Sequence, residues 1–340
     1  MIEIVLNIHY LESLIHAILS VIKPTEDDRK KRLGAVEEIV NSIHVVGVSR
    51  DAVRPFGSFA SKLYAKSGDL DVSVQLSNHS GFPTSEKQKK KALIELGRAL
   101  QTKGIARDVQ FILDARVPVL KYVSNHFGIS CDISIDNLPG RIKSRVLYLI
   151  STLDDRIGDM VLLVKEWARA QNINDPKTGT LSSYTLCILV LIHFQNCKPA
   201  ILPPLKEIFY ASIAEGSGGF NEKHFHQIWE ENMAKLRRQN IGQRNQSSLS
   251  DLLATFFEQK STYYTRQLKQ TQEMAKSSCR IVDDPFDISD KAAMITVDVP
   301  GLWRIASAFE RANYIINSCQ PADVSELISL LCTPEVGSKL

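Results

Sequence analysis

The spacing of apolar residues along this chain changes from a helical period to an alternating one, and then back to a helical one. Near the N-terminus, apolar residues recur at every third or fourth position from Ile4 to Leu19, which predicts an amphipathic helix. The pattern breaks at Pro24, and Thr25, followed by acidic residues, predicts the N-cap and first turn of another helix. Residues 1–44 are therefore expected to form a pair of helices.

Residues 45–145 contain short segments in which apolar and polar positions alternate, together with one segment of helical spacing. Alternation or β-branched enrichment predicts strands at 69–76, 106–113, 117–123 and 129–135. Between them, residues 86–102 have the spacing of an amphipathic helix. This mixture of strands and helices predicts an α/β domain over residues 45–145.

From residue 146 onward the apolar spacing is helical again. Helices are predicted at 155–171, 181–195, 247–262, 300–317 and 324–331, with a Gly- and Ser-rich loop at 215–219. We therefore expect an α+β protein in which a larger helical domain (146–325) follows the α/β domain. The helices of residues 1–44 are expected to pack on the helical domain, and residues 326–340 to form a C-terminal tail.

The composition fits a globular protein of two domains and adds few further constraints. The chain has 340 residues, of which 44% are apolar and 23% charged, and its net charge of +3 permits contact with nucleic acid without requiring it. The cysteines are scattered with no C-x-x-C pair, so we expect reduced thiols rather than a zinc site or a disulfide framework. Acidic and histidine residues interrupt the apolar N-terminal segment, and neither a signal peptide nor a membrane span is predicted.

Three aspartates are the candidate chemical site. On a strand, side chains two positions apart share a face, so Asp69 and Asp71 project side by side, and Asp132 lies on the polar face of a second strand. Carboxylates that close repel one another unless a cation lies between them. Hard oxygen ligands suit Mg²⁺ or Mn²⁺, and two such ions catalyse in-line displacement at phosphate. Two solvent-facing acidic strands are the alternative interpretation.

A Gly-Ser pair upstream of these aspartates adds a second feature. Gly57 and Ser58 precede a predicted strand with the pattern Asp-x-Asp, and such a pair lets backbone N–H groups approach a phosphate closely. The order of Gly57-Ser58, Asp69-x-Asp71 and a later Asp132 resembles the DNA polymerase β-like nucleotidyltransferase superfamily. This resemblance implies a palm domain with a mixed sheet, and an active site in the cleft between that domain and the helical one.

Motifs in the helical half narrow the resemblance. The segments VLLVKEWAR (161–169), NINDP (172–176) and GTLSSYTL (179–186) closely resemble the central domain of noncanonical poly(A) polymerases and terminal uridylyltransferases. DDPFD (283–287) resembles their PAP-associated segment. Within the family, PFGSF, GDLDVSV, ARVPVLK and SCDISIDNL most resemble plant enzymes of the HEN-one suppressor type, which add uridines to small RNAs lacking 3′ methylation. The implied activity is the transfer of UMP from UTP to an RNA 3′-hydroxyl, which marks the RNA for decay.

The resemblance implies a role for each matching residue. Asp69, Asp71 and Asp132 would bind two Mg²⁺ or Mn²⁺ ions, and Asp132 would also help to deprotonate the RNA 3′-hydroxyl. The other matches would bind UTP: the triphosphate at Gly57, Ser58, Lys165 and Arg169; the base and ribose near Asn137; the sugar at Lys143 and Ser144; the stacked base at Tyr184 beside Ser183; and the uracil edge at Asp284 and Asp287.

Several of these residues also have a purely structural interpretation. Tyr184 fits a core position, and Lys165 with Arg169 fits a solvated helix face. Asp284 and Asp287 fit the capping of a turn. Trp167 is expected in the core. The basic runs 87–91 and 235–238 fit either RNA contact or a solvated surface.

Two departures from the family pattern leave the choice between UTP and ATP open. Some relatives have a histidine three residues after the acidic position matched by Asp287, where this chain has Asp290. Residues 259–278 are polar and rich in Lys and Gln, whereas the family usually has a longer segment there. A noncanonical poly(A) polymerase and a non-catalytic RNA-binding relative are therefore the alternatives to a uridylyltransferase.

The implied partners are the 3′ ends of small RNAs, such as unmethylated miRNA or siRNA, and a small-RNA effector protein, with no membrane. The expected location is the cytoplasm, the nucleus or both.

Overall fold

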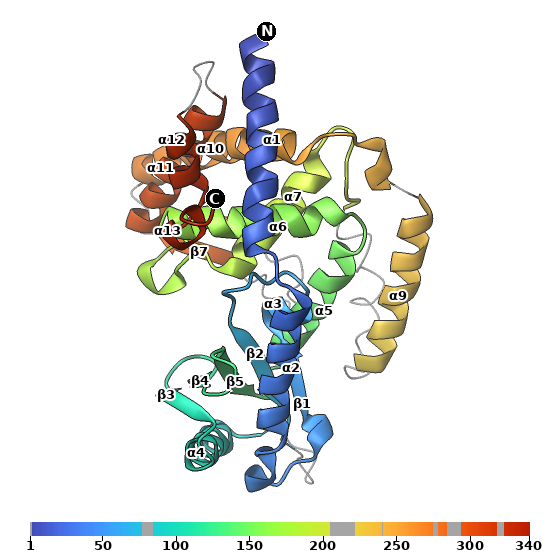
Figure 1. The fold of residues 1–340 in the computed structure, drawn as a ribbon, viewed down its shortest axis with the longest axis vertical. Helices are drawn as coiled ribbons and strands as arrows, with labels where there is room; N and C mark the ends of the chain where they lie inside the picture. The colour runs from blue at the N-terminus through green and yellow to red at the C-terminus, as the bar shows by residue number, and fades with distance from the viewer. Residues whose placement is uncertain are drawn as a thin grey trace. The chain divides into compact units, whose positions relative to one another are not determined.

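The computed structural model describes residues 2–76, 84–204, 222–239, 241–274, 278–283, 294–317 and 323–340 (Figure 1). The chain divides into two compact units, one of residues Lys23–Ile150 and one of residues Met1–Ile22 with Ser151–Leu340. The first contains a mixed sheet and the second is mostly helical. The fold class is thus α+β, as predicted from the sequence.

The sheet of the first unit has five strands. Their spatial order is β1 (Val53–Phe56), β2 (Leu70–Val74), β5 (Ser130–Ile135), β4 (Val119–Ser124) and β3 (Ala106–Ile112). The β2–β5 pair is parallel, and the other neighbouring pairs are antiparallel. The alternating segments therefore all form strands. β1 was not predicted, because it is a short edge strand that contains Pro55, which cannot donate to a ladder.

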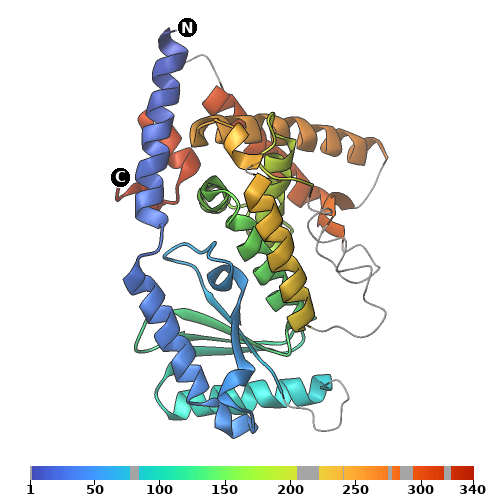
Figure 2. The same cartoon turned by 90° about the vertical axis from the view of Figure 1, so that its right-hand side faces the viewer.

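One face of the sheet packs against helices. Apolar side chains of the central strands, such as Val72 and Ile133, form a buried core with Leu96 of α4 (Glu86–Thr102) and Ile39 of α2 (Glu26–Val40). Figure 2 shows α4 (cyan) running across this face of the sheet. Because side chains alternate along a strand, this packing turns the aspartates of β2 and β5 to the opposite face.

The other elements of this unit precede or follow the strands of the sheet. Thr25 caps α2 as predicted, in a capping box with Asp28. α5 (Leu138–Ser151) follows β5 directly and begins before the residue at which helical spacing becomes visible in the sequence. The remaining elements are α3 (Gly57–Ala60) and the 3₁₀ helices η1 (Ile43–Val46) and η2 (Arg50–Ala52).

The second unit is built around α6 (Asp155–Ala170). Trp167 of α6 is fully buried, with ring centroids 4.8 Å from Phe257 and 4.6 Å from Phe309, which confirms its predicted place in the core. The other described helices of this unit are α1 (Ile2–Ile22), α7 (Ser183–Asn196), α9 (Glu222–Gln239), α10 (Leu249–Glu273), α11 (Val299–Asn317), α12 (Val324–Leu331) and α13 (Pro334–Gly337). The unit also contains the 3₁₀ helices η3 (Pro176–Thr178) and η5 (Ile241–Arg244) and the strand pair of β6 (Ser278–Asp283) and β7 (Met294–Asp298).

This grouping differs from the predicted domain boundaries at both ends of the chain. α1 packs on α10 and α6 in the helical unit, whereas α2 packs against the sheet. Residues 326–340, expected as a tail, form most of α12 and all of α13, and α12 packs on α6. The polar segment after residue 259 extends α10 to Glu273, because Tyr264 in it is fully buried.

No described helix is long and apolar enough to span a membrane. The cysteines within the described residues are free thiols, as expected.

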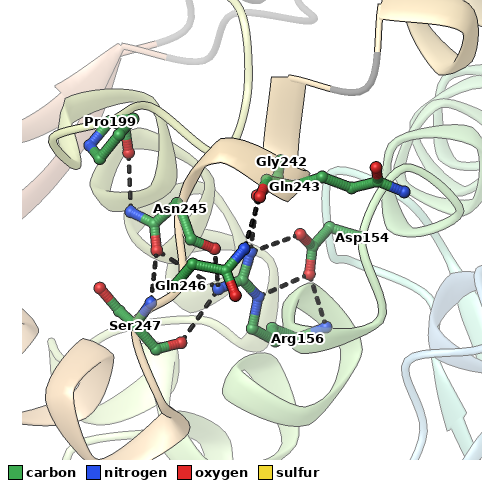
Figure 3. A network of polar contacts seen from close by, with 8 residues as sticks. All are labelled: Asp154, Arg156, Pro199, Gly242, Gln243, Asn245, Gln246 and Ser247. Atoms are coloured by element: carbon green, nitrogen blue, oxygen red, sulfur yellow. Dashed lines mark hydrogen bonds and ion pairs between the residues drawn. The ribbon is translucent and has the colours of Figure 1, made fainter.

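A buried polar network fixes the start of α6 in the helical unit (Figure 3). The Arg156 guanidinium forms an ion pair with Asp154 (Nη2–Oδ2 2.7 Å). It also donates to the backbone carbonyls of Gly242 (3.0 Å), Asn245 (2.9 Å) and Ser247 (3.0 Å). One side chain thereby joins the N-terminus of α6 to the loop after η5, which lies far away in the sequence.

Replacing Arg156 with Met should destabilise the helical unit by about 2–4 kcal/mol, because three carbonyls lose their side-chain donor and the largely buried Asp154 carboxylate loses its ion-pair partner. Differential scanning calorimetry would report a lower unfolding midpoint. Arg244→Met is the matched control, since Arg244 is exposed in the adjacent η5, and its midpoint should stay unchanged. Equal midpoints for the two variants would show that the network contributes no stability.

Candidate active site

The parallel pairing of β2 and β5 brings two of the candidate aspartates together. Asp71 and Asp132 are register partners in this pair, so their Cα atoms lie opposite each other on neighbouring strands. Asp69 stands one residue before β2 and is exposed, and Asp71 and Asp132 are partly buried. The sheet therefore places all three on or next to the face that is not covered by the core helices.

Lys121 is a neighbour of this group that sequence reasoning missed. It is the register partner of Asp132 across the β4–β5 pair, and its Nζ forms an ion pair with Asp132 Oδ2. The motif ARVPVLK contains it, but only the strand pairing reveals its partner. No three carboxylate, histidine or cysteine side chains of the described residues are grouped as a finished metal site. Like charges separate when no cation lies between them, and Lys121 here supplies the counter-charge for Asp132.

The donors on this face nevertheless fit a hard divalent cation. Carboxylate oxygens on adjacent strands are the ligands that Mg²⁺ and Mn²⁺ prefer. The neighbouring thiol of Cys131 does not compete, because it points into the core and burial raises its pKa to about 12. The site is thus chemically an oxygen-only site.

Gly57 occupies a position that requires glycine for two reasons. Its φ of +65° lies in the left-handed region, and a Cβ there would lie 2.0 Å from Asp71 Oδ2. Its N–H donates to Ser144 Oγ at 2.6 Å. The next residue, Ser58, closes the turn, since its carbonyl accepts from the N–H of Leu63 at 3.0 Å. The Gly-Ser turn and the Asp71 carboxylate are therefore in direct contact.

The start of α5 supports this turn. Asn137 donates its N–H to Ser73 Oγ at 3.0 Å, and its Oδ1 accepts from the N–H of Gly140 at 3.1 Å. Ser144 is buried and donates its hydroxyl to the carbonyl of Gly140 at 2.6 Å while accepting from Gly57. In this structure Ser144 thus braces the Gly-Ser turn, and its contact with a sugar stays a prediction. Lys143, beside it, is partly exposed.

The helical unit holds the other candidate residues. Lys165 is only 5% exposed, so the interpretation of a solvated face is wrong for it. Arg169, one turn later on the same helix, is partly exposed, and its Nη1 lies 3.6 Å from Oε2 of Glu166. Ser183 and Tyr184 open α7; Ser183 is exposed and Tyr184 is partly buried rather than a core residue.

The residues predicted to read the uracil edge, Asp284 and Asp287, lie outside the described residues, as does Asp290.

The sequence is similar to known proteins along most of its length. The family model of the central palm domain of mitochondrial-like poly(A) RNA polymerase matches residues 11–152. Protein HESO1 of Arabidopsis thaliana is 41% identical over 331 residues, which cover 91% of this chain and 65% of the Arabidopsis protein. Terminal uridylyltransferase cid1 of Schizosaccharomyces pombe is 29% identical over 89% of this chain and 78% of the yeast protein.

The fold is similar to that of solved structures as well. A crystal structure of mtPAP in complex with UTP has a TM-score of 0.72 at 20% identity, covering 96% of this chain and 72% of that chain. A crystal structure of the Cid1 poly(U) polymerase has a TM-score of 0.69 at 25% identity, covering 94% and 97%. The fold is that of a DNA polymerase β-like nucleotidyltransferase. Within that class, the chain is similar along most of its length to the Arabidopsis protein, of which it spans 65%, and to the yeast terminal uridylyltransferase. The similarity to the Arabidopsis protein supports the resemblance to plant enzymes seen in the sequence.

Replacing Gly57 with Ala should reduce nucleotidyl transfer by on the order of a hundredfold, because the new Cβ displaces the Asp71 carboxylate. The left-handed backbone should add a stability cost of about 1–2 kcal/mol. Gly104→Ala is the matched control, since Gly104 has a φ of +69° and a Cβ there would meet no atom within 4 Å. Comparing the initial rates and melting midpoints of both variants separates the clash from the strain. Equal activities would contradict the role of the contact with Asp71.

Proposed function

We propose that this protein is a template-independent RNA uridylyltransferase that adds UMP from UTP to the 3′-hydroxyl of small RNAs. Its proposed substrates lack 2′-O-methylation at the 3′ end, and uridylation marks them for decay. The observation that carries the proposal is the register of Asp71 and Asp132 beside the Gly57-Ser58 turn. The similarity along most of the chain to a protein named terminal uridylyltransferase supports the choice of reaction.

The residues of the sheet would hold the reacting groups. Asp69, Asp71 and Asp132 would bind two divalent cations, which when bound supply Lewis-acid stabilisation of charge on the attacking and leaving oxygens. Asp132 would accept the proton of the RNA 3′-hydroxyl, and its Oδ2 is bound by Lys121 in this structure. The Ser58 hydroxyl and the amides of its turn would bind the triphosphate.

The roles proposed for residues of the helical unit also concern the nucleotide. Lys165, which is 5% exposed, and Arg169, which is partly exposed, would neutralise the triphosphate. Tyr184 would stack on the base, which contributes roughly 1–3 kcal/mol with little dependence on base identity. Uracil selection is therefore assigned to Asp284 and Asp287.

The RNA would contact basic surface residues. Lysines of α4 and of the run 235–238 are exposed or partly exposed and would neutralise phosphates, so the affinity for RNA should fall with salt concentration. A small-RNA effector protein would present the 3′ end, in the cytoplasm or the nucleus.

A nucleotide-preference assay tests the proposed function. The purified protein, Mg²⁺ and a 3′-hydroxyl RNA oligonucleotide are incubated with each of the four NTPs in turn. We expect extension with UTP well above that with ATP, and reduced extension of an oligonucleotide with a 2′-O-methylated 3′ end. Preferential extension with ATP would instead identify a poly(A) polymerase, and no extension with any NTP a non-catalytic RNA-binding relative.

Replacing Asp69 or Asp132 with Ala should abolish extension, by at least about a thousandfold, while the protein stays folded, because each change removes a ligand of the reacting metals. Circular dichroism checks the fold of both variants. Asp136→Ala is not a suitable control, because Asp136 Oδ1 accepts from the N–H of Leu76. Asp114→Ala is suitable, because Asp114 is exposed and its ion pair is with Lys90 of α4, away from the aspartates. Undiminished tailing by Asp69→Ala or Asp132→Ala would refute the metal-site assignment.

A further inference from the structure

A buried arginine lies beneath the segment that leads into the aspartate strand. Arg32 of α2 is 2% exposed, whereas Arg29, one turn earlier on the same helix, has 52% of its side chain exposed and pairs with Glu26. The Arg32 guanidinium lies over the ring of Tyr64, 4.8 Å from its centroid. The two arginines thus differ completely in environment although they share a helix.

The Arg32 guanidinium binds the backbone just before Asp69. Its Nη2 donates to the carbonyls of Lys66 at 2.8 Å and Gly68 at 2.6 Å, and lies 3.5 Å from that of Ala65. Its Nη1 donates to the carbonyl of Asp28 at 3.2 Å, within its own helix. The segment 65–68 is a turn, closed by the N–H of Gly68 donating to the carbonyl of Ala65 at 2.9 Å. Arg32 therefore fixes this turn to α2.

The charge of Arg32 is unusual for so buried a group. Within the described part of the chain no carboxylate lies at ion-pair distance from it; carbonyl dipoles and the face of Tyr64 surround it instead. Burial lowers the pKa of Arg32, while the negative charge of Asp69 is among the influences that raise it. A guanidinium stays protonated in such a setting. A buried cation is thus held by backbone carbonyls and an aromatic face directly before a proposed metal ligand.

From these contacts we propose that Arg32 is a positioning residue of the metal site: it fixes the turn that leads into Asp69 and so holds the start of the aspartate strand in place. This inference rests on the proposed metal-binding role of the aspartates. Arg32 is buried, so it is not proposed as a ligand of nucleotide or metal. It acts through the backbone of residues 65–68, as the groups behind metal ligands do in other proteins.

The test measures metal binding directly. Mn²⁺ is titrated into the protein without nucleotide or RNA, and the free ion is followed by electron paramagnetic resonance. Arg32→Met, which keeps the apolar stem and loses the charge and the donors, should weaken Mn²⁺ binding about tenfold. Arg32→Lys keeps the charge but cannot donate to the same carbonyls from one planar group, so it should weaken binding less, by severalfold. Arg29→Met is the matched control and should bind Mn²⁺ like the wild type.

A second measurement separates positioning from a merely structural role. The Mg²⁺ concentration for half-maximal transfer should rise for Arg32→Met, while the KM for UTP at saturating Mg²⁺ should change much less. A lower melting midpoint combined with wild-type Mn²⁺ affinity would overturn the proposal and leave Arg32 as a stabilising residue. If Arg32→Met does not fold, Arg32→Lys decides: weaker Mn²⁺ binding supports the proposal, and unchanged binding overturns it.

The Mn²⁺ titration tests the role of Arg32 independently of the proposed uridylyltransferase activity. Asp69→Ala serves as the reference for lost Mn²⁺ binding and involves no RNA or nucleotide. A protein that transfers AMP instead of UMP, or nothing, still reports whether Arg32 shapes the metal site.

Discussion

The parallel pairing of β2 with β5 is the constraint on which the rest of this site depends. A parallel pair cannot be joined by a tight turn, and here the chain between the two strands includes α4, β3 and β4. The apolar face of the pair is buried under α4 and α2, so the register cannot slip by one residue without burying charges. Asp71 is thereby held opposite Asp132, and the surrounding structure has to accommodate two carboxylates that repel each other.

Directly after β1, a glycine and its hydrogen-bond partners leave room for the Asp71 carboxylate. The Gly57 turn can contact Asp71 only because it has no Cβ, and the hydroxyl of Ser144 satisfies the Gly57 N–H from behind. Ser144 is in turn held by the carbonyl of Gly140. A phosphate-binding turn needs a defined backbone before its ligand arrives, because ordering it on binding would cost affinity. The first turns of α5 thus help to preorganise a segment far away in the sequence.

Much of this was predictable from the sequence, and the remainder was not for identifiable reasons. Alternation assigned the face of Asp71 and Asp132 because one face is buried, and the periodicity of residues 86–102 predicted α4 with both ends correct. The same reasoning missed β1, because Pro55 is unfavourable in a strand. It also missed the extension of α10, because that segment is polar apart from residues such as Tyr264, which is buried in the structure. It also missed Lys121, and the alternative interpretation of Lys165 as part of a solvated face was wrong. Periodicity reports which face is buried, but not which side chain on a neighbouring strand or helix will meet a charge.

The two cations near the aspartates differ in how they act, and that difference follows from their contacts. Lys121 binds the Asp132 carboxylate itself, on a partly exposed face, so a divalent cation at Asp132 must displace it or share an oxygen with it. A compact ammonium on a flexible stem can move away at little cost. Arg32 binds carbonyls and is buried, so it stays in place whether or not a metal is bound. One cation therefore acts directly on a carboxylate, and the other maintains the backbone that leads into the aspartate strand.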